Sequence, residues 1–327
     1  MGNSASAFGW TRRRLLSIPG AAAISGCALG SRPRVIFIGD GPSKEFLPWR
    51  QFRDAVMSQQ ASLLDKADLH YLQCPKLDHA RKRQLIRSEA QQSATVLVAP
   101  SGNSAAMAVE VAPRTPVVFA SFLDPVRAGF VLSNRVPGAM ATGVSLADRL
   151  DGKRLQLLQQ AFPEIRRVGI LTDRSWQQHY DGESRVLAEA SALGLQVQLH
   201  IGETADDIGP LMGSARAARH QAWYVMPTDL AYVGESRIKS NLRRLGVPAM
   251  YSTLGEVERG GELAYAADAS FVYPTLAELV KRIVDGESPG RIPIERPRRF
   301  LLIARSDARW HTQPINARLL QRANVIF

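Results

Sequence analysis

The feature that most constrains the fold is an alternation of two kinds of segment along the chain after residue 33. Short runs of apolar and β-branched residues are typical of strands buried on both faces of a sheet. The longer amphipathic segments between them fit helices that return the chain to the next parallel strand. This rhythm predicts repeated parallel α/β units rather than a helical bundle or an antiparallel sandwich.

A first set of units covers residues 33–145. Its expected strands are residues 34–39, 69–74, 95–99 and 116–120, with an extended segment at 141–145. Its expected helices are residues 52–64, 78–92 and 105–111. The order predicts one doubly wound, Rossmann-like lobe.

A second set of units begins after a helix expected at residues 151–162. Its expected strands are residues 168–171, 196–201, 222–225, 248–251 and 263–265. Its expected helices are residues 178–193, 205–218, 235–245 and 254–259. Gly194 and Gly246 follow two of these helices, where a left-handed cap is expected.

The two sets predict two α/β lobes joined by a hinge. Lobe 1 is expected at residues 33–145, with a helix near 271–284 and the chain up to about residue 300 returning to it. Lobe 2 is expected at residues 146–270, and the C-terminal segment 301–327 is left unassigned. Ligands of open parallel sheets bind beyond the carboxyl ends of the strands, so two facing lobes predict a binding cleft between them.

The N-terminal residues resemble an export signal. Three arginines at 12–14 precede a short apolar run at 18–24, which is far below the roughly 20 residues of a membrane-spanning helix. The arginines fit a twin-arginine signal, and a generic positive region fits them too. We therefore expect residues 1–27 to be a signal peptide and the protein to work outside the cytoplasm, in the periplasm or cell envelope.

The export signal ends in Ile-Ser-Gly-Cys, which resembles a lipobox with Cys27 as the acylated residue. A lipid on Cys27 would tether the protein to a membrane. Ordinary cleavage near Ala23 or Ala28 is the alternative.

Composition bears on the partners. The chain has a net charge of +11, but its basic residues are dispersed, so we expect a solvated surface and no nucleic-acid partner. Two cysteines and six scattered histidines provide neither a disulfide framework nor a metal-ligand spacing, so no metal and no cofactor are expected. Nucleophile-elbow, phosphate-loop and His-Glu-x-x-His motifs are absent, and we therefore expect a protein that is not an enzyme.

Ser101, Asn103 and Ser104 open the helix that follows the third expected strand. Backbone N–H groups and hydroxyls at a helix N-terminus favour an anion such as a carboxylate. The alternative is a simple N-cap with no ligand.

Asp124 and Asp229 each follow the carboxyl end of an expected strand, one in each lobe. Either carboxylate could bind a ligand ammonium, and a role as a turn or cap residue is the alternative. Ser175 and Trp176 follow the first strand of lobe 2 and are expected to line the cleft. Tyr251 and Tyr265 end apolar strands, where they could contact a flat ligand or pack in the core.

Several motifs resemble the ABC-transporter substrate-binding protein family that includes tryptophan and phenylalanine receptors. They are residues 116–119, 124–126, 137–138, 142–145, 152–158, 245–251, 260–265 and 292–297, followed by Phe300. The resemblance covers roughly residues 95–327 and implies a periplasmic-binding-protein fold of type I. It also implies a small solute, an amino acid or a related carboxylate, that is delivered to a membrane permease with its ATPase. The Gly-Thr-Pro-Ala-Ala-like segment of the family corresponds here to residues 101–105, which differ from it.

Two other functions fit the same residues. One is a sensor or assembly lipoprotein that reports a ligand to a membrane partner without transport. The other is an exported hydrolase that uses Ser101 or Ser104, for which the sequence assigns no histidine and aspartate partners.

Overall fold

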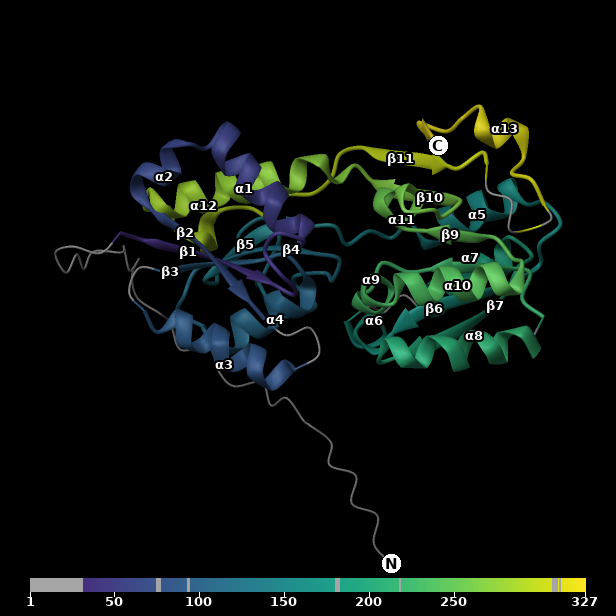
Figure 1. The fold of residues 1–327 in the computed structure, drawn as a ribbon, viewed down its shortest axis with the longest axis horizontal. Coiled ribbons are helices and arrows are strands. Elements are labelled where there is room, and N and C mark those ends of the chain that lie inside the picture. The colour runs from purple at the N-terminus through teal and green to yellow at the C-terminus, as the bar shows by residue number, and fades with distance from the viewer. Residues whose placement is uncertain are drawn as a thin grey trace, which may run out of the picture.

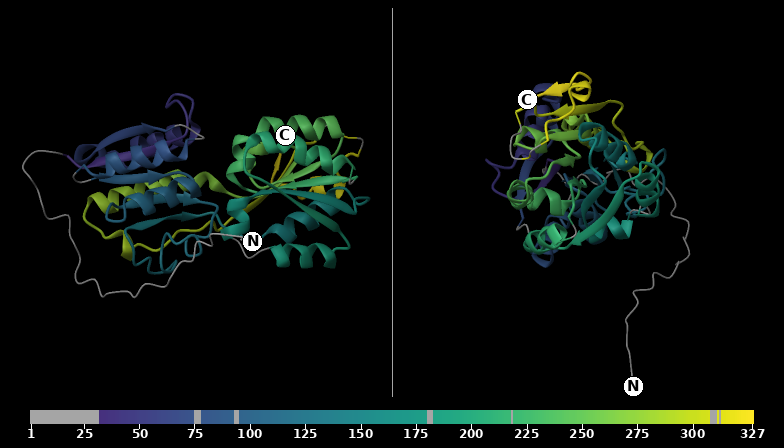
Figure 2. Two further views of the ribbon diagram at one scale, coloured as in Figure 1. Left: turned by 90° about the horizontal axis from the view of Figure 1, so that it is seen from below. Right: turned by 90° about the vertical axis from the view of Figure 1, so that its right-hand side faces the viewer.

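The computed structural model describes residues 32–74, 78–92, 95–179, 183–217, 219–307, 311 and 313–327. Two α/β lobes lie end to end along the long axis of the molecule (Figures 1 and 2). Each lobe is a largely parallel sheet covered by helices on both faces. Among the described residues, no helix combines the length and apolar character that a membrane span needs. Residues 1–27, expected to be a signal peptide, lie outside the described residues, and so does Cys27.

Lobe 1 is built on a five-stranded parallel sheet in the order β2-β1-β3-β4-β5. Its strands are β1 (Arg34–Gly39), β2 (Asp68–Gln73), β3 (Thr95–Ala99), β4 (Val117–Ser121) and β5 (Ala141–Ser145). Its helices are α1 (Leu47–Gln59), α2 (Ser62–Lys66), α3 (His79–Ala90), α4 (Gly102–Val111) and α12 (Val272–Val284). The apolar side chains of α1 and α12 form the core on one face, and those of α3 and α4 form it on the other.

Lobe 2 is built on a seven-stranded sheet in the order β12-β11-β10-β9-β8-β6-β7. Its strands are β6 (Arg167–Asp173), β7 (Gln196–Gly202), β8 (Ala222–Val225), β9 (Ala249–Tyr251), β10 (Leu263–Ala267), β11 (Phe300–Ala304) and β12 (Val325–Ile326). Its helices are α5 (Asp151–Ala161), α6 (Arg174–His179), α7 (Glu183–Ala192), α8 (Ile208–Ala217), α9 (Asp229–Val233), α10 (Glu235–Leu245), α11 (Leu254–Glu258) and α13 (Ala317–Leu320). Short 3₁₀ turns lie at Ala205–Asp207, Ala269–Phe271 and Pro289–Arg291.

The described chain passes between the lobes at residues 146–150, 268–271 and 295–299, here called the first, second and third crossings. The third crossing is held to β5, because the amide of Glu295 donates to the carbonyl of Gly143 and its carbonyl accepts from Ser145, both at 2.9 Å. It is also held to the second crossing, where the amide of Asp268 donates to the carbonyl of Arg299 at 3.0 Å. These bonds tie the second and third crossings to each other and the third crossing to lobe 1.

The structure differs from the predicted elements at identifiable points. The helix predicted at 52–64 begins at Leu47, because Pro48 stands in its first turn, where a missing amide does no harm. The apolar run predicted only as a C-terminal segment becomes β11, which pairs antiparallel with β10 and joins the lobe 2 sheet. Helix α9 has five residues, too few to show a periodic pattern in the sequence.

Candidate functional site

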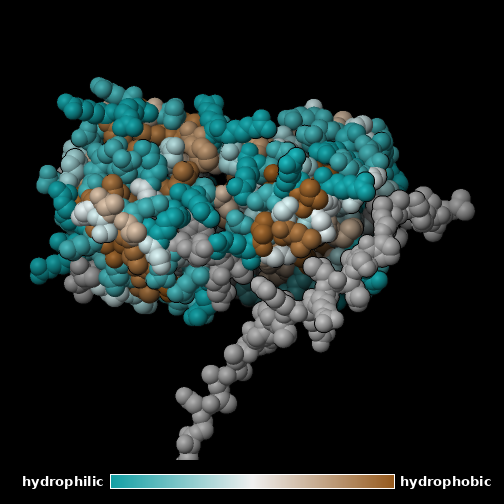
Figure 3. Space-filling view, turned by 180° about the vertical axis from the view of Figure 1, so that it is seen from behind, coloured by the Kyte–Doolittle hydropathy of each residue, from teal (hydrophilic) through white to brown (hydrophobic). Residues whose placement is uncertain are grey.

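A cleft of about 700 Å³ lies between the lobes, at the carboxyl ends of the parallel strands. Residues that follow β1, β3 and β4 line it from lobe 1, and residues that follow β6, β7 and β8 line it from lobe 2. The space-filling view shows a hollow between the two lobes, with apolar patches among hydrophilic side chains on each of them (Figure 3). The volume lies within the range typical of small-molecule sites.

The lobe 1 wall is the N-terminus of α4. Ser101 caps this helix, since its hydroxyl accepts from the amide of Ser104 at 3.2 Å. The buried Lys82 reaches the same turn, where its Nζ donates to the Ser104 hydroxyl at 2.8 Å and pairs with Asp40 at 2.5 Å. A helix N-terminus beside a lysine gives this wall a positive potential, which Asp40 partly offsets.

The lobe 2 wall is the N-terminus of α9. Thr228 caps the helix by accepting from the amide of Ala231 at 3.2 Å, and Asp229 is the first helical residue. Burial raises the pKa of Asp229 to about 6, with Asp173 and Asp40 adding to the effect. A hydrogen bond from Asn103 in lobe 1 and the charge of Lys82 act in the opposite direction. Asn103 and Asp229 therefore join the two lobes across the cleft.

Asp173 holds the lobe 2 wall in shape. Its Oδ1 accepts from the amide of Trp176 at 2.8 Å, which caps α6, and its Oδ2 accepts from the amide of Leu230 at 3.5 Å. One carboxylate therefore links the end of β6 to the starts of α6 and α9. This link places Trp176 and Asp229 on the same side of the cleft.

Aromatic side chains from both lobes line the cleft. They are Phe46, Phe122, Trp176, Tyr232 and Tyr273. Phe122 is 40% exposed and Tyr232 is 54% exposed, so both rings offer apolar surface to the cleft. Burial raises the pKa of both Tyr232 and Tyr273, so both hydroxyls stay neutral at ordinary pH. The cleft thus combines charged walls with apolar surface.

Arg154 closes the floor of the cleft at the hinge. Its guanidinium is buried and binds the carboxylate of Asp148, in the first crossing, through two hydrogen bonds of 2.9 and 2.7 Å. Its Nε donates to the carbonyl of Tyr265, in the middle of β10, at 2.8 Å. Burial by itself lowers the pKa of Arg154, but contacts with Tyr224 and Asp148 raise it above its usual value. The residue stays charged and ties the first crossing to the lobe 2 sheet.

The structure brings together some of the residues that the sequence singled out. Ser101, Asn103, Trp176 and Asp229 line the cleft, and Ser104 lies directly behind its wall in contact with Lys82. The side chain of Ser175 lies outside the described residues. That these residues contact a ligand is part of the function proposed for the cleft.

Other expected residues lie elsewhere, which corrects their assignment to the cleft. Tyr251 is 2% exposed and packs in the lobe 2 core, because β9 is an interior strand with helices on both faces. Tyr265 packs against Phe300 with ring centroids 6.2 Å apart. Asp124 lies outside the cleft lining and stabilises a turn, since its carboxylate accepts from the amides of Val126 and Arg127.

The sequence analysis missed several cleft residues. Asp40 follows β1 and Asp173 ends β6, both at the carboxyl ends of parallel strands, so the rule that singled out Asp229 could have found them too. Lys82 had no such signal, because a lysine in a charged helix usually faces solvent. Phe122 and Tyr232 lie in a loop and a short helix, where no periodicity indicates their direction.

The comparisons with known proteins agree with this architecture. The family model described as "ABC transporter substrate binding protein" matches residues 64–325. A tyrosine-binding protein of Clostridioides difficile is 25% identical over 207 residues, which span 61% of this chain and 57% of that protein. The match thus spans less than two thirds of the length of that relative.

Solved structures show the same fold. An ABC domain from Streptococcus pneumonia in complex with L-Trp superposes with a TM-score of 0.80 at 17% identity, covering 91% of this chain and 100% of that one. A leucine-binding protein from Thermotoga maritima gives a TM-score of 0.59 at 13% identity, covering 80% and 86%. These likenesses confirm the predicted two-lobe fold of type I periplasmic binding proteins. With the family model matching most of its length, the chain belongs to the ABC transporter substrate-binding protein family.

Proposed function

We propose that the protein captures an amino acid with a flat apolar side chain in the inter-lobe cleft and delivers it to a membrane permease and its ATPase. The observation that carries this proposal is the pairing of opposite electrostatic walls in one cleft. The α4 N-terminus and Lys82 lie on lobe 1. Asp229 lies opposite them on lobe 2, where its carboxylate is hydrogen-bonded to Asn103 of α4. An α-amino acid carries both charges that such walls would bind.

In this proposal, the ligand carboxylate binds at Ser101 and Asn103, and its ammonium binds Asp229. The elevated pKa of Asp229 means that its charge is poorly compensated when no ligand is bound. A ligand ammonium would supply that compensation, and this makes the carboxylate a strong attachment point. The aromatic residues of the cleft would then surround the ligand side chain, and the names of the tyrosine-binding and L-Trp-bound relatives support an aromatic one.

Binding would work by favouring a closed arrangement of the lobes. The ligand contacts both walls, so it binds a closed state more tightly than an open one and shifts the population toward it. The hinge restricts this motion, because Arg154 and the bonds of the third crossing fix how the crossings lie against one another. The permease would recognise the closed form.

The place of action is part of the same proposal. A substrate-binding protein of an importer works outside the cytoplasm, which agrees with the export signal in the sequence. Lipidation of Cys27 would keep it beside the permease, and mass spectrometry of the mature N-terminus would decide between a lipoprotein and ordinary cleavage.

The direct test is calorimetry of the purified protein with L-Trp, L-Tyr and L-Phe, with L-Ala and glucose as comparison ligands. We expect an aromatic amino acid to bind and tryptamine, which lacks the carboxylate, to bind much more weakly. Asp229→Asn should weaken binding by roughly 10- to 100-fold, as loss of a charge-assisted hydrogen bond does.

The matched control is Asp206→Asn, which removes the same charge from an exposed carboxylate of lobe 2 that pairs with Arg237. Its affinity should equal that of the wild type. Equal affinities for the Asp229 variant and the wild type would contradict the assigned role of Asp229. Failure of every amino acid to bind would contradict the proposed ligand class and favour a sensor or assembly role.

A further inference from the structure

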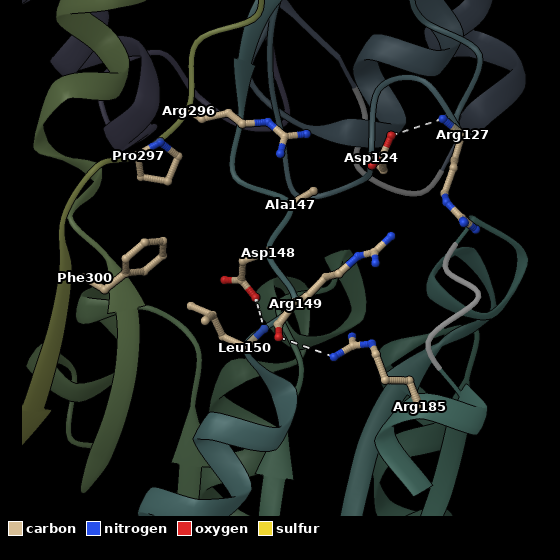
Figure 4. Close-up of a pocket in the computed structure, with 10 residues that line it drawn as sticks. All are labelled: Asp124, Arg127, Ala147, Asp148, Arg149, Leu150, Arg185, Arg296, Pro297 and Phe300. Carbon is tan, nitrogen blue, oxygen red and sulfur yellow. Dashed lines mark hydrogen bonds between the residues drawn. The ribbon is translucent and has the colours of Figure 1, made fainter. Parts of the chain in front are cut away.

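A second cavity, of about 310 Å³, lies at the hinge. Its lining comes from both lobes and from two of the crossings, and Asp148 in the first crossing is shared with the main cleft. Figure 4 shows guanidinium groups from four directions extending toward this space. They belong to Arg127 after β4, Arg149 in the first crossing, Arg185 in α7 and Arg296 in the third crossing.

The carboxylates near this cavity are already engaged. Asp148 binds the buried Arg154 through two hydrogen bonds. Asp124 accepts from two backbone amides of its own turn. Arg185 pairs with Asp151 at 2.9 Å and with Glu189 at 3.1 Å, so its own charge is offset within lobe 2. The amide bonds do not neutralise Asp124, so its charge offsets part of the positive charge at this cavity.

Arg149 and Arg296 stand out within this group. In the part of the chain that the structure describes, neither guanidinium has a carboxylate oxygen within 4.0 Å. Both residues lie in hinge crossings, and both side chains are exposed at the edge of the cavity that they line. Like charges held around one small volume repel each other, and a bound anion relieves that repulsion.

We propose that the hinge cavity is a second binding site, for a small anion of the phosphate type. Guanidinium groups bind phosphate oxygens in a planar, bidentate manner, and a volume of about 310 Å³ accommodates a phosphate or a phosphate ester. The anion could be free in solution or be the headgroup of a lipid. The site does not depend on which solute occupies the main cleft.

The test is calorimetry and thermal unfolding of the full chain with inorganic phosphate, at constant ionic strength maintained with chloride. The wild type should bind phosphate and gain thermal stability with increasing concentration. The double variant Arg149→Gln with Arg296→Gln should bind at least 10-fold more weakly. The control double variant Arg298→Gln with Arg299→Gln removes the same charge from the third crossing, at side chains outside the cavity lining, and should match the wild type.

Equal loss of binding in both double variants would show a general charge effect and would overturn the site. A second arm measures co-sedimentation with phosphatidylglycerol and phosphatidylcholine vesicles. Binding to phosphatidylglycerol alone, lost in the Arg149 and Arg296 variant and kept in the control, would support the site with a lipid headgroup as its ligand. Absence of binding to both phosphate and anionic vesicles would overturn the hinge site. Amino-acid affinity measured on the same samples reports separately on the main cleft.

Discussion

Asp229→Asn should make the protein more stable at pH 7, although it weakens the proposed ligand binding. Burial, with Asp173 and Asp40 nearby, raises the pKa of Asp229 from 3.8 to about 6 in the folded protein. The folded state therefore binds the proton more tightly than the unfolded state does. The stability that this proton contributes is fully present below pH 3.8 and is lost as the pH rises through about 6.

The size of the effect follows from the shift. About two pKa units correspond to about 3 kcal/mol at pH 7, and burying the uncharged amide of asparagine reduces the expected gain to about 2 kcal/mol. Asparagine has the same shape and can keep a hydrogen bond with Asn103, so the variant removes the charge with little change in packing.

The assay is urea unfolding of the wild type, Asp229→Asn and Asp206→Asn between pH 4 and pH 8. The difference in free energy of unfolding between Asp229→Asn and the wild type should be largest above pH 7 and approach zero near pH 4. Asp206→Asn should stay within about 0.5 kcal/mol of the wild type, as exposed ion pairs usually do. A stability difference for Asp229→Asn that is negative at pH 7, or that does not change with pH, would refute the reasoning.

Three further perturbations test other parts of the structure. Arg154→Met should lower the free energy of unfolding by about 3 to 5 kcal/mol in urea titrations, because it leaves the carboxylate of Asp148 without its buried partner; a loss below 1 kcal/mol would show that the hinge does not need this pair. Burial, with His220 nearby, lowers the pKa of His200 to about 4, so the folded state binds fewer protons than the unfolded state does. The free energy of unfolding should therefore fall as the pH falls from 6.5 toward 4. Thermal unfolding should find this pH dependence reduced in His200→Phe. Burial raises the pKa of the Cys74 thiol to about 11. The thiol should therefore react with iodoacetamide at pH 8 far more slowly in the folded protein than in urea. Equal rates would show that the thiol is accessible.

Much of the fold was predictable because the strands are buried on both faces. Strands such as residues 34–39, 95–99 and 222–225 appear in the sequence as short apolar runs, and the structure has them at the same bounds. The order of such runs and helices is enough to predict parallel α/β lobes, since parallel strands need a helical crossover. The pairing of β11 with β10 was not predictable, because an apolar run carries no information about strand direction.

The candidate site was predictable only in part, for a related reason. Residues after parallel strands were expected at one edge of each sheet, and Ser101, Asn103, Trp176 and Asp229 do line the cleft there. Tyr251 was misassigned because the sequence does not show that β9 lies inside the sheet with both faces covered. Strand position, rather than residue type, decided its burial.

The sequence by itself determined the two α/β lobes and the sheet edges at which the cleft lies, because periodicity and motif order are local properties of the chain. Only the tertiary structure decided which charges face one another. Lys82 meets Ser104 across 22 positions, and Arg154 meets the middle of β10 across 111, through contacts that depend on how helices and crossings pack. The same packing brings arginines from both lobes and two crossings to one hinge cavity, a convergence that no local pattern in the chain encodes.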